Sequence, residues 1–334
     1  MYLLVRCSCV AVVVGLAVMP GCQSHSGPTT APTSQPQDAL RSYEYRQIHM
    51  GVQARLVVYA LDEETAANAC RVAYRRIAEI DRIASDYMVD SELNRLCAKA
   101  GGPPVVVSDE LFYLLQTSCD IAQRSNGVFD PTVGPLIRLW RGARKLESPR
   151  LPSPDQIAAA KQLVGYNKIK FDAPGRTIQL TTPGMKLDLG GIAKGYAAHQ
   201  AVLSLKDQGL GISFCEFGGD VYVGDSPPNR PGWVMEVTND AGRRKSRKIF
   251  VRNTGVSTSG DSEQFVMIDG QRYSHIVDPR TGIGLTQSTL VTILHPQGII
   301  SDGLSTALSV LPPDQGRALA KSYNAKTYIR PAEY

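Results

Sequence analysis

Asp302 and Thr306 lie four residues apart in the apolar stretch 301–311, which ends at Pro312. Apolar residues recur there at helical spacing, and a separation of four places the carboxylate and the hydroxyl on one face of the expected helix. Oxygen ligands of this kind suit a hard cation such as Mg²⁺. In the structural alternative, Asp302 caps the helix and Thr306 hydrogen-bonds to its own preceding turn. This segment by itself favours the structural alternative.

A glycine-rich segment at residues 186–196 reads KLDLGGIAKGY. We expect a short strand, a turn at Gly190 and Gly191, and the start of a helix. Free backbone N–H groups at a helix start attract phosphate, glycines allow close approach, and Lys194 adds a positive charge. The spacing matches neither a P-loop nor a dinucleotide fingerprint. A purely structural strand–turn–helix therefore explains the segment equally well.

Residues 273–282 read YSHIVDPRTG and follow a hydroxyl-rich stretch at 256–261. A histidine that titrates near neutral pH can accept a proton from a hydroxyl nucleophile, which makes His275 a candidate base. The alternative is a hairpin with an Asp-Pro turn. Tyr87 lies ahead of Ser91-Glu92, and its ring suits stacking on a flat heterocycle or packing in the core. Residues 128–136, VFDPTVGPL, form a further candidate segment.

Several classes of function are excluded by composition. The chain has 334 residues and a formal net charge of +5, which is too mild to indicate a nucleic-acid partner. Its basic run at 243–248 is best explained as a solvated hairpin face. The 5 histidines include no pair at helical i,i+4 spacing, and no Gly-x-Ser-x-Gly or Cys-x-x-Cys motif occurs among the 7 cysteines. Cys70, Cys97, Cys119 and Cys215 are expected to be small buried side chains, with a disulfide left open.

We expect both helices and strands to position these residues. Apolar periodicity predicts helices over residues 63–85, 109–125, 154–164, 197–206 and 316–323. Strands are predicted over residues 52–60, 168–171, 177–180, 221–224, 233–238, 248–251, 264–268 and 290–294. Because strands and helices cluster instead of alternating strictly, an α+β fold with mixed β-sheets packed with helices is favoured over a doubly wound sheet.

The N-terminal part of the chain differs from the rest. Residues 1–22 combine Arg6 with the apolar stretch 10–18 and end at Cys22, as a lipoprotein signal peptide does, although Met19 replaces the usual leucine. Plain cleavage and an uncleaved anchor are the alternatives to lipidation. Residues 23–40 are rich in Pro, Ser and Thr and predict a flexible tether. Residues 41–334 are expected to form a single large domain.

The order of these segments along the chain resembles the ApbE family, the FAD:protein FMN transferases once called thiamine-biosynthesis lipoproteins. The blocks 188–195, DLGGIAKG, and 275–282, HIVDPRTG, carry most of the resemblance, with Tyr87, residues 129–136, Asp302 and Thr306 in support. It covers residues 45–325. The chain departs from the family's pattern at His199, commonly aspartate, and at Glu216, often asparagine.

The resemblance implies a single ApbE-like domain that acts outside the cytoplasm. FAD is the implied substrate, and its implied contacts are Met50, Tyr87, Val128, Phe129, Asp130, Asp188, Lys194 and Ile276. Mg²⁺ is the implied cofactor, held by Asp302, Thr306 and the backbone carbonyl of Gly191. His275 is the implied catalytic base. The implied location is the periplasmic side of the bacterial inner membrane, with a lipid on Cys22 as the anchor.

The implied activity is Mg²⁺-dependent transfer of FMN from FAD to a Ser or Thr hydroxyl of an acceptor flavoprotein, such as a redox-pump subunit, with release of AMP. In a first alternative, water replaces the acceptor and the protein is a periplasmic FAD pyrophosphatase. In a second, it is a flavin-binding lipoprotein without catalysis. Release of AMP in the absence of an acceptor separates the first two hypotheses, and tight FAD binding without turnover marks the third.

Overall fold

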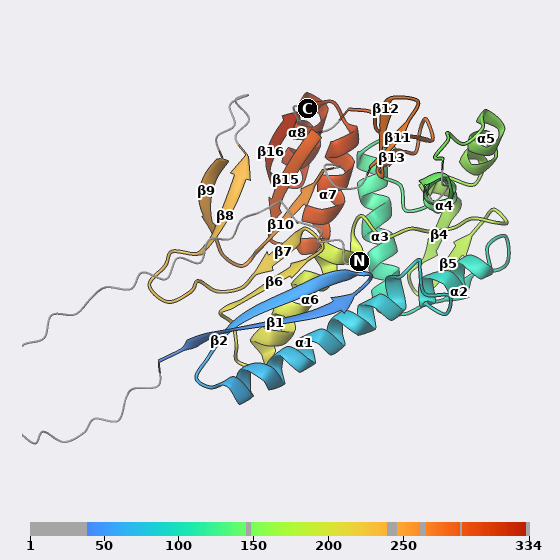
Figure 1. Cartoon of the computed structure of the whole chain (residues 1–334). Coiled ribbons are helices and arrows are strands. Elements are labelled where there is room, and N and C mark those ends of the chain that lie inside the picture. Colours follow the sequence, from blue (N-terminus) through green and yellow to red (C-terminus); the bar gives the residue numbers. More distant parts are fainter. Residues whose placement is uncertain (1–38, 145–147, 239–245, 261–264, 288, 332–334) are drawn as a thin grey trace, which may run out of the picture.

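The computed structural model describes residues 39–331 apart from 145–147, 239–245, 261–264 and 288. Its centre is a seven-stranded antiparallel sheet with the order β1-β2-β6-β7-β10-β15-β16 (Figure 1). The strands are β1 (Arg41–His49), β2 (Val52–Ala60), β6 (Ser213–Phe217), β7 (Asp220–Val223), β10 (Thr254–Ser259), β15 (Thr289–His295) and β16 (Lys326–Pro331). The expected signal peptide and nearly all of the expected tether lie outside the described residues.

Both faces of the central sheet are covered. Three helices, α1 (Glu63–Ala84), α6 (Ala193–Asp207) and α7 (Gly298–Val310), pack on one face and on one another. The hairpin of β8 (Trp233–Thr238) and β9 (Ser246–Val251) packs on the other through Trp233 and Met235. Strand β2 has apolar residues on both faces, so both need cover. Leu56 and Val58 join the core under the helices, and Val57 and Tyr59 join the core under the hairpin. Successive side chains of a strand point to opposite faces.

Smaller elements surround this sheet. α3 (Asp109–Arg124) follows α2 (Glu92–Ala98), and β3 (Val105–Val106), β5 (Thr177–Leu180) and β4 (Ile169–Asp172) form a three-stranded sheet. A second group consists of α4 (Gly134–Arg144), α5 (Pro154–Gln162), β11 (Phe265–Ile268), β12 (Gln271–Ser274), β13 (Val277–Asp278) and β14 (Ile283–Gly284). Leu136, Trp140 and Val277 share one small apolar core in this group. α8 (Pro313–Ser322) leads into the edge strand β16.

Two glycines allow α6 and α7 to touch backbone to backbone. A Cβ atom added at Gly195 would lie 2.3 Å from the carbonyl oxygen of Gly298, and one added at Gly298 would lie 2.2 Å from that of Gly195. Real Cβ atoms do not approach an oxygen so closely, so only glycine fits at either position. This crossing brings the first turn of α6 directly against the first two turns of α7.

The α+β class is confirmed, as are most of the expected helices and strands. The prediction of a strand at 186–189 is wrong, because that segment is extended without strand pairing, and α6 begins at Ala193 instead of residue 197. Cys70, Cys97 and Cys215 are buried and free, whereas Cys119 is free but only half-buried. Within the described residues, no helix is both long enough and apolar enough to cross a membrane.

Candidate active site

Asp302 lies in the second turn of α7, which begins at Gly298, so it does not cap its own helix. Its carboxylate is 4% exposed, and Oδ2 accepts a hydrogen bond of 2.9 Å from the backbone N–H of Gly195. The structural alternative of an own-helix cap is therefore wrong. Instead, the carboxylate sits at the positive end of α6, where a negative charge is stabilised by unpaired N–H groups and the helix dipole.

Thr306 differs from the other hydroxyl residues of its helix. Ser301, Ser305 and Ser309 each donate to a carbonyl oxygen of the preceding turn of α7. Thr306 makes no such bond within the part of the chain that the structure describes, so the alternative of back-bonding is also wrong. Its Oγ1 lies 3.0 Å from the place where a Cβ at Gly191 would be, so it faces the glycine turn across a space that any side chain would fill.

Lys194 connects the glycine turn to two buried carboxylates. Its Nζ lies 3.0 Å from Asp220 Oδ2 and 3.8 Å from Asp302 Oδ2, and it donates to the carbonyl oxygen of Gly190 at 3.0 Å. Burial lowers the pKa of Lys194, but the attraction of Asp220 and Asp302 outweighs it, so the pKa is raised and the amine stays charged. Sequence reasoning missed Asp220. The sequence feature that could have indicated this residue is the Gly-Gly-Asp turn between β6 and β7.

Burial raises the pKa of Asp302, whereas it lowers that of Lys194. Desolvation, with a smaller contribution from the nearby Asp220 carboxylate, raises the pKa of Asp302 to about 7 against the opposing effect of Lys194. A carboxylate whose charge is disfavoured in this way gains from a further cation close by.

Asp188 shapes the start of the glycine turn. Its Oδ1 accepts from the backbone N–H of Gly190 at 2.8 Å, and its Oδ2 accepts from Arg141 at 3.2 Å. Arg141 also pairs with Asp86, and its guanidinium carbon lies 4.3 Å from the centre of the Tyr87 ring. Asp188 and Tyr87, two predicted FAD contacts from distant parts of the sequence, are thus brought together by a residue that sequence reasoning did not single out.

The segment Val128 to Asp130 is next to this turn, because the N–H of Asp188 donates to the carbonyl of Pro131 at 2.8 Å. Asp130 uses its carboxylate within the loop, where it accepts from the N–H groups of Thr132 and Tyr166 at 2.8 and 2.9 Å. The Phe129 ring lies 3.4 Å from the Cβ position of Gly191. Since all three side chains are buried, a ligand would meet this segment chiefly through its backbone.

The remaining predicted residues come from the turn between β1 and β2 and from the β11–β14 group. Met50 occupies the turn with a φ of +47°, and its N–H donates to Asp81 at 3.2 Å. Gly218 joins this region to the cluster, because a Cβ there would lie 3.0 Å from Val52 and 3.1 Å from Lys194. His275 and the buried Ile276 connect β12 to β13, in the group that packs on α4.

The charges gathered here do not balance. Among the described residues, the four carboxylates of Asp86, Asp188, Asp220 and Asp302 lie near three cations: Lys194 and Arg141 pair with them directly, and Arg144 lies close to Arg141 and Tyr87. A ligand with a pyrophosphate group would add more negative charge. Because uncompensated buried charge is costly, the arrangement favours a divalent cation. Within the described residues no group of three or more His, Cys, Asp or Glu could hold a metal, so a site here needs hydroxyl and carbonyl oxygens as well.

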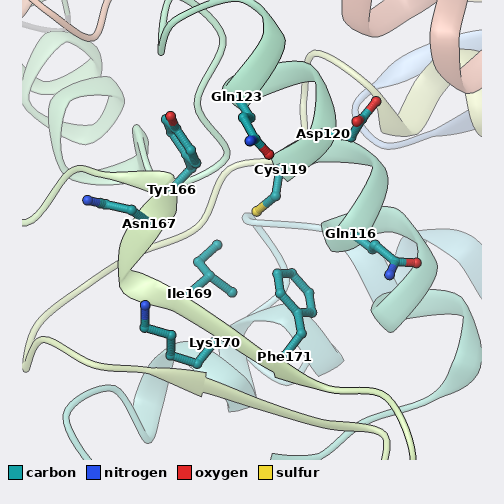
Figure 2. A pocket seen from close by; sticks show the side chains of 9 residues that line it. All are labelled: Gln116, Cys119, Asp120, Gln123, Tyr166, Asn167, Ile169, Lys170 and Phe171. Atoms are coloured by element: carbon teal, nitrogen blue, oxygen red, sulfur yellow. The ribbon is translucent and has the colours of Figure 1, made fainter.

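A hollow lies between α3 and the start of β4 (Figure 2), and one residue that lines it, Tyr166, donates its backbone N–H to Asp130. Cys119, Asp120, Lys170 and Phe171 are among the residues that line it. None of the predicted site residues lines it.

Comparisons with known proteins identify the family of this chain. Residues 50–329 match the ApbE family, and the chain belongs to that family. A FAD:protein FMN transferase of Treponema pallidum is 29% identical over 301 residues, which cover 85% of this chain and 83% of that protein. Another, from Klebsiella pneumoniae, is 28% identical over 286 residues, 84% of this chain and 81% of the relative.

Solved structures of this family share the fold. The flavinyl transferase ApbE of Pseudomonas stutzeri superposes with a TM-score of 0.78 at 27% identity, covering 90% of this chain and 94% of that one. The ApbE protein of Thermotoga maritima gives a TM-score of 0.76 at 29% identity, with 88% and 97% covered.

Proposed function

We propose that this protein transfers FMN from FAD to a Ser or Thr hydroxyl of another protein and releases AMP. Its family and the names of its relatives support FMN transfer to proteins. The site offers what phosphoryl transfer needs, namely a charged lysine, buried carboxylates and a glycine turn at a helix start. The observation that carries the proposal is the Thr306 hydroxyl, which has no hydrogen-bond partner among the described residues and faces Gly191, one turn from the buried Asp302.

The donor set fits Mg²⁺. Asp302, Thr306 and the Gly191 carbonyl supply only oxygen atoms, which hard cations prefer, and the excess of carboxylates needs a cation. When bound, Mg²⁺ would neutralise phosphate charge and polarise the phosphorus atom under attack. Asp302 also holds the α6 terminus in place through Gly195, and Lys194 presents its amine beside the same turn.

The reaction itself exchanges one P–O bond for another. The acceptor hydroxyl oxygen attacks the phosphorus of the FMN half, and the bond from that phosphorus to the bridging oxygen breaks, so that AMP leaves with this oxygen. His275 accepts the hydroxyl proton, a role worth on the order of a hundredfold to ten-thousandfold in rate. Lys194 offsets the negative charge that develops on the phosphate oxygens.

The test is incubation with FAD, Mg²⁺ and a flavoprotein domain that carries an acceptor hydroxyl. We expect a fluorescent band that survives denaturation, and we expect Asp302→Asn to abolish it because the amide removes the negative charge from the proposed site. An Asp302→Asn protein that labels the acceptor as fast as wild type would refute the metal assignment. AMP release at the full rate without acceptor would instead indicate a pyrophosphatase, and FAD binding without turnover a flavin carrier.

We further propose that the protein is exported and anchored by a lipid on Cys22, on the periplasmic side of the inner membrane. The proposal rests on the apolar stretch 10–18 that precedes Cys22 and on the polar segment after Cys22. A Cys22→Ser protein should move from the membrane fraction to the soluble periplasmic fraction with its transferase rate unchanged. Retention of this variant in the membrane would contradict lipid anchoring.

A further inference from the structure

One guanidinium joins two loops of the site. Arg141, at the end of α4, pairs through Nη1 with Asp86 and through Nη2 with Asp188, 3.2 Å away. The plane of the same group lies over the Tyr87 ring, 4.3 Å from its centre. The arginine side chain is 25% exposed and both carboxylates are about 10% exposed or less, so these contacts are partly shielded from water and stronger than surface pairs.

Arg141 is itself carried by a firmly packed helix. The preceding residue, Trp140, is fully buried, and its indole N–H donates to the carbonyl of Gly282 at 2.9 Å. Leu136, one turn earlier, lies in the same apolar core. Since the helix cannot rotate without breaking this core, the backbone position from which the arginine side chain extends is fixed.

The Tyr87 loop has a fixed backbone and an exposed side chain. The Asn94 amide donates to the carbonyls of Asp86 and Met88 at 3.1 and 2.8 Å, and the Ser91 hydroxyl donates to that of Ser85 at 2.6 Å. Tyr87 is nonetheless 70% exposed. A ring as open as this loses rotamer entropy when a ligand stacks on it, unless another group already holds it.

We propose that Arg141 is a positioning residue for FAD. It holds one face of the Tyr87 ring, so that the other face is ready for a flat heterocycle, and it fixes Asp188, whose other oxygen shapes the Gly190 turn. The inference rests on the proposed function, because it takes Tyr87 and Asp188 to be FAD contacts. Arg141 touches neither the phosphates nor the acceptor in this account.

The test is a double-mutant cycle on FAD affinity with the full chain, measured in Mg²⁺ by quenching of FAD fluorescence. Arg141→Met keeps the length of the side chain but removes the guanidinium, and we expect it to raise the Kd of FAD about tenfold. Tyr87→Leu should raise it by a similar factor. The double variant should bind more tightly than the product of the two fold-changes predicts, because the contribution of the braced ring is shared and is lost only once. If the fold-changes in Kd of the two single variants multiply in the double variant, the inference is wrong.

Matched variants separate positioning from a general structural role. Arg138→Met, on an exposed position of the same helix, should leave the Kd unchanged. Arg141→Lys keeps the charge but loses the planar group that pairs with both carboxylates, so it should still fold, yet raise KM for FAD without lowering kcat. If this variant binds FAD as tightly as wild type, the Arg141 guanidinium does not hold the Tyr87 ring for FAD binding. Wild-type protein that binds no FAD would refute the proposed function itself, which is a distinguishable result.

Discussion

At the scale of single residues, function depends on which polar groups the fold leaves without a partner. In α7 three serines satisfy their hydroxyls within the helix, and Thr306 does not. The sequence predicted that Asp302 and Thr306 share a face, because helical spacing requires it. It could not decide between a cap and a metal ligand. That choice depends on where α7 begins and on what faces it, and both are set by the crossing with α6.

Thr306→Val tests the hydroxyl with almost no change of shape. We expect the transfer rate at limiting Mg²⁺ to fall at least ~10-fold, because an isosteric methyl cannot ligate a cation, and higher Mg²⁺ should recover part of it. Titrating Mg²⁺ in the transfer assay measures this. Ser305→Ala is the control, since that hydroxyl bonds to the carbonyl of Asp302, and its Mg²⁺ dependence should match wild type. If the transfer rate of Thr306→Val depends on Mg²⁺ as that of wild type does, Thr306 does not bind the cation.

His199 should make stability depend on pH. Burial, followed by the nearby His295, lowers the pKa of His199 to about 4, and its ring stacks on Tyr222 at 4.0 Å. The folded pKa is lower than the ordinary ~6.5, so the fold favours the neutral ring. The resulting stability is complete above about pH 6.5 and is lost as the pH falls towards 4.

We therefore expect His199→Gln to lose less stability than wild type between pH 7 and pH 5. The difference should be on the order of 1 kcal/mol after allowance for a ring that is partly open to solvent. Urea unfolding at both pH values measures it. If the two proteins lose the same free energy, His199 does not titrate in this way.

At the scale of elements, the site is built by the crossing of α6 and α7. Sequence patterns predicted the amphipathic helices and the alternating strand β2 well, because their periods are clear in the chain. They did not predict β1, β6, β10, β16, α2 or α4. The mostly buried β6 shows no alternation, and the first turn of α6 is so rich in glycine and alanine that it has no amphipathic pattern to detect.

Gly195→Ala tests this crossing. We expect it to destabilise the fold by about 3 kcal/mol, because the new methyl group would strike the backbone of Gly298. Thermal or urea unfolding measures the change. Gly142→Ala is the control: nothing lies within 4 Å of its Cβ position in α4, so alanine should be neutral or stabilising by up to ~1 kcal/mol. A stable Gly195→Ala protein would show that the two helices separate easily.

At the scale of the whole molecule, the site gathers residues from both ends of the described chain. The turn between β1 and β2, the loops after α1 and α3, the start of α6 and the middle of α7 all contribute. The order of motifs in the sequence was enough to indicate the family. It could not show that Arg141 and Asp220 complete the arrangement, because neither is close in sequence to the residues it contacts.

Ligands that join so many segments should stabilise the whole fold. We expect FAD with Mg²⁺, at about 100 times its Kd, to raise Tm by roughly 5 °C, and more than FAD or Mg²⁺ alone. Differential scanning fluorimetry measures this, with AMP plus Mg²⁺ as a comparison that lacks the flavin. In Thr306→Val the Mg²⁺-dependent part of the shift should vanish. An equal shift for FAD with and without Mg²⁺ would argue that the cation is not bound beside the nucleotide.

The late position of α7 in the chain has a consequence for the timing of activity. This helix packs on the sheet against the neighbouring strands β10 and β15, and it follows β15 in the chain. It carries both side chains proposed to bind the cation. A ribosome releases the N-terminal segments first, so a growing polypeptide has Tyr87 and Lys194 long before it has Asp302. A growing chain therefore cannot assemble the proposed cation site until α7 has been made, so the proposed activity belongs only to the finished protein.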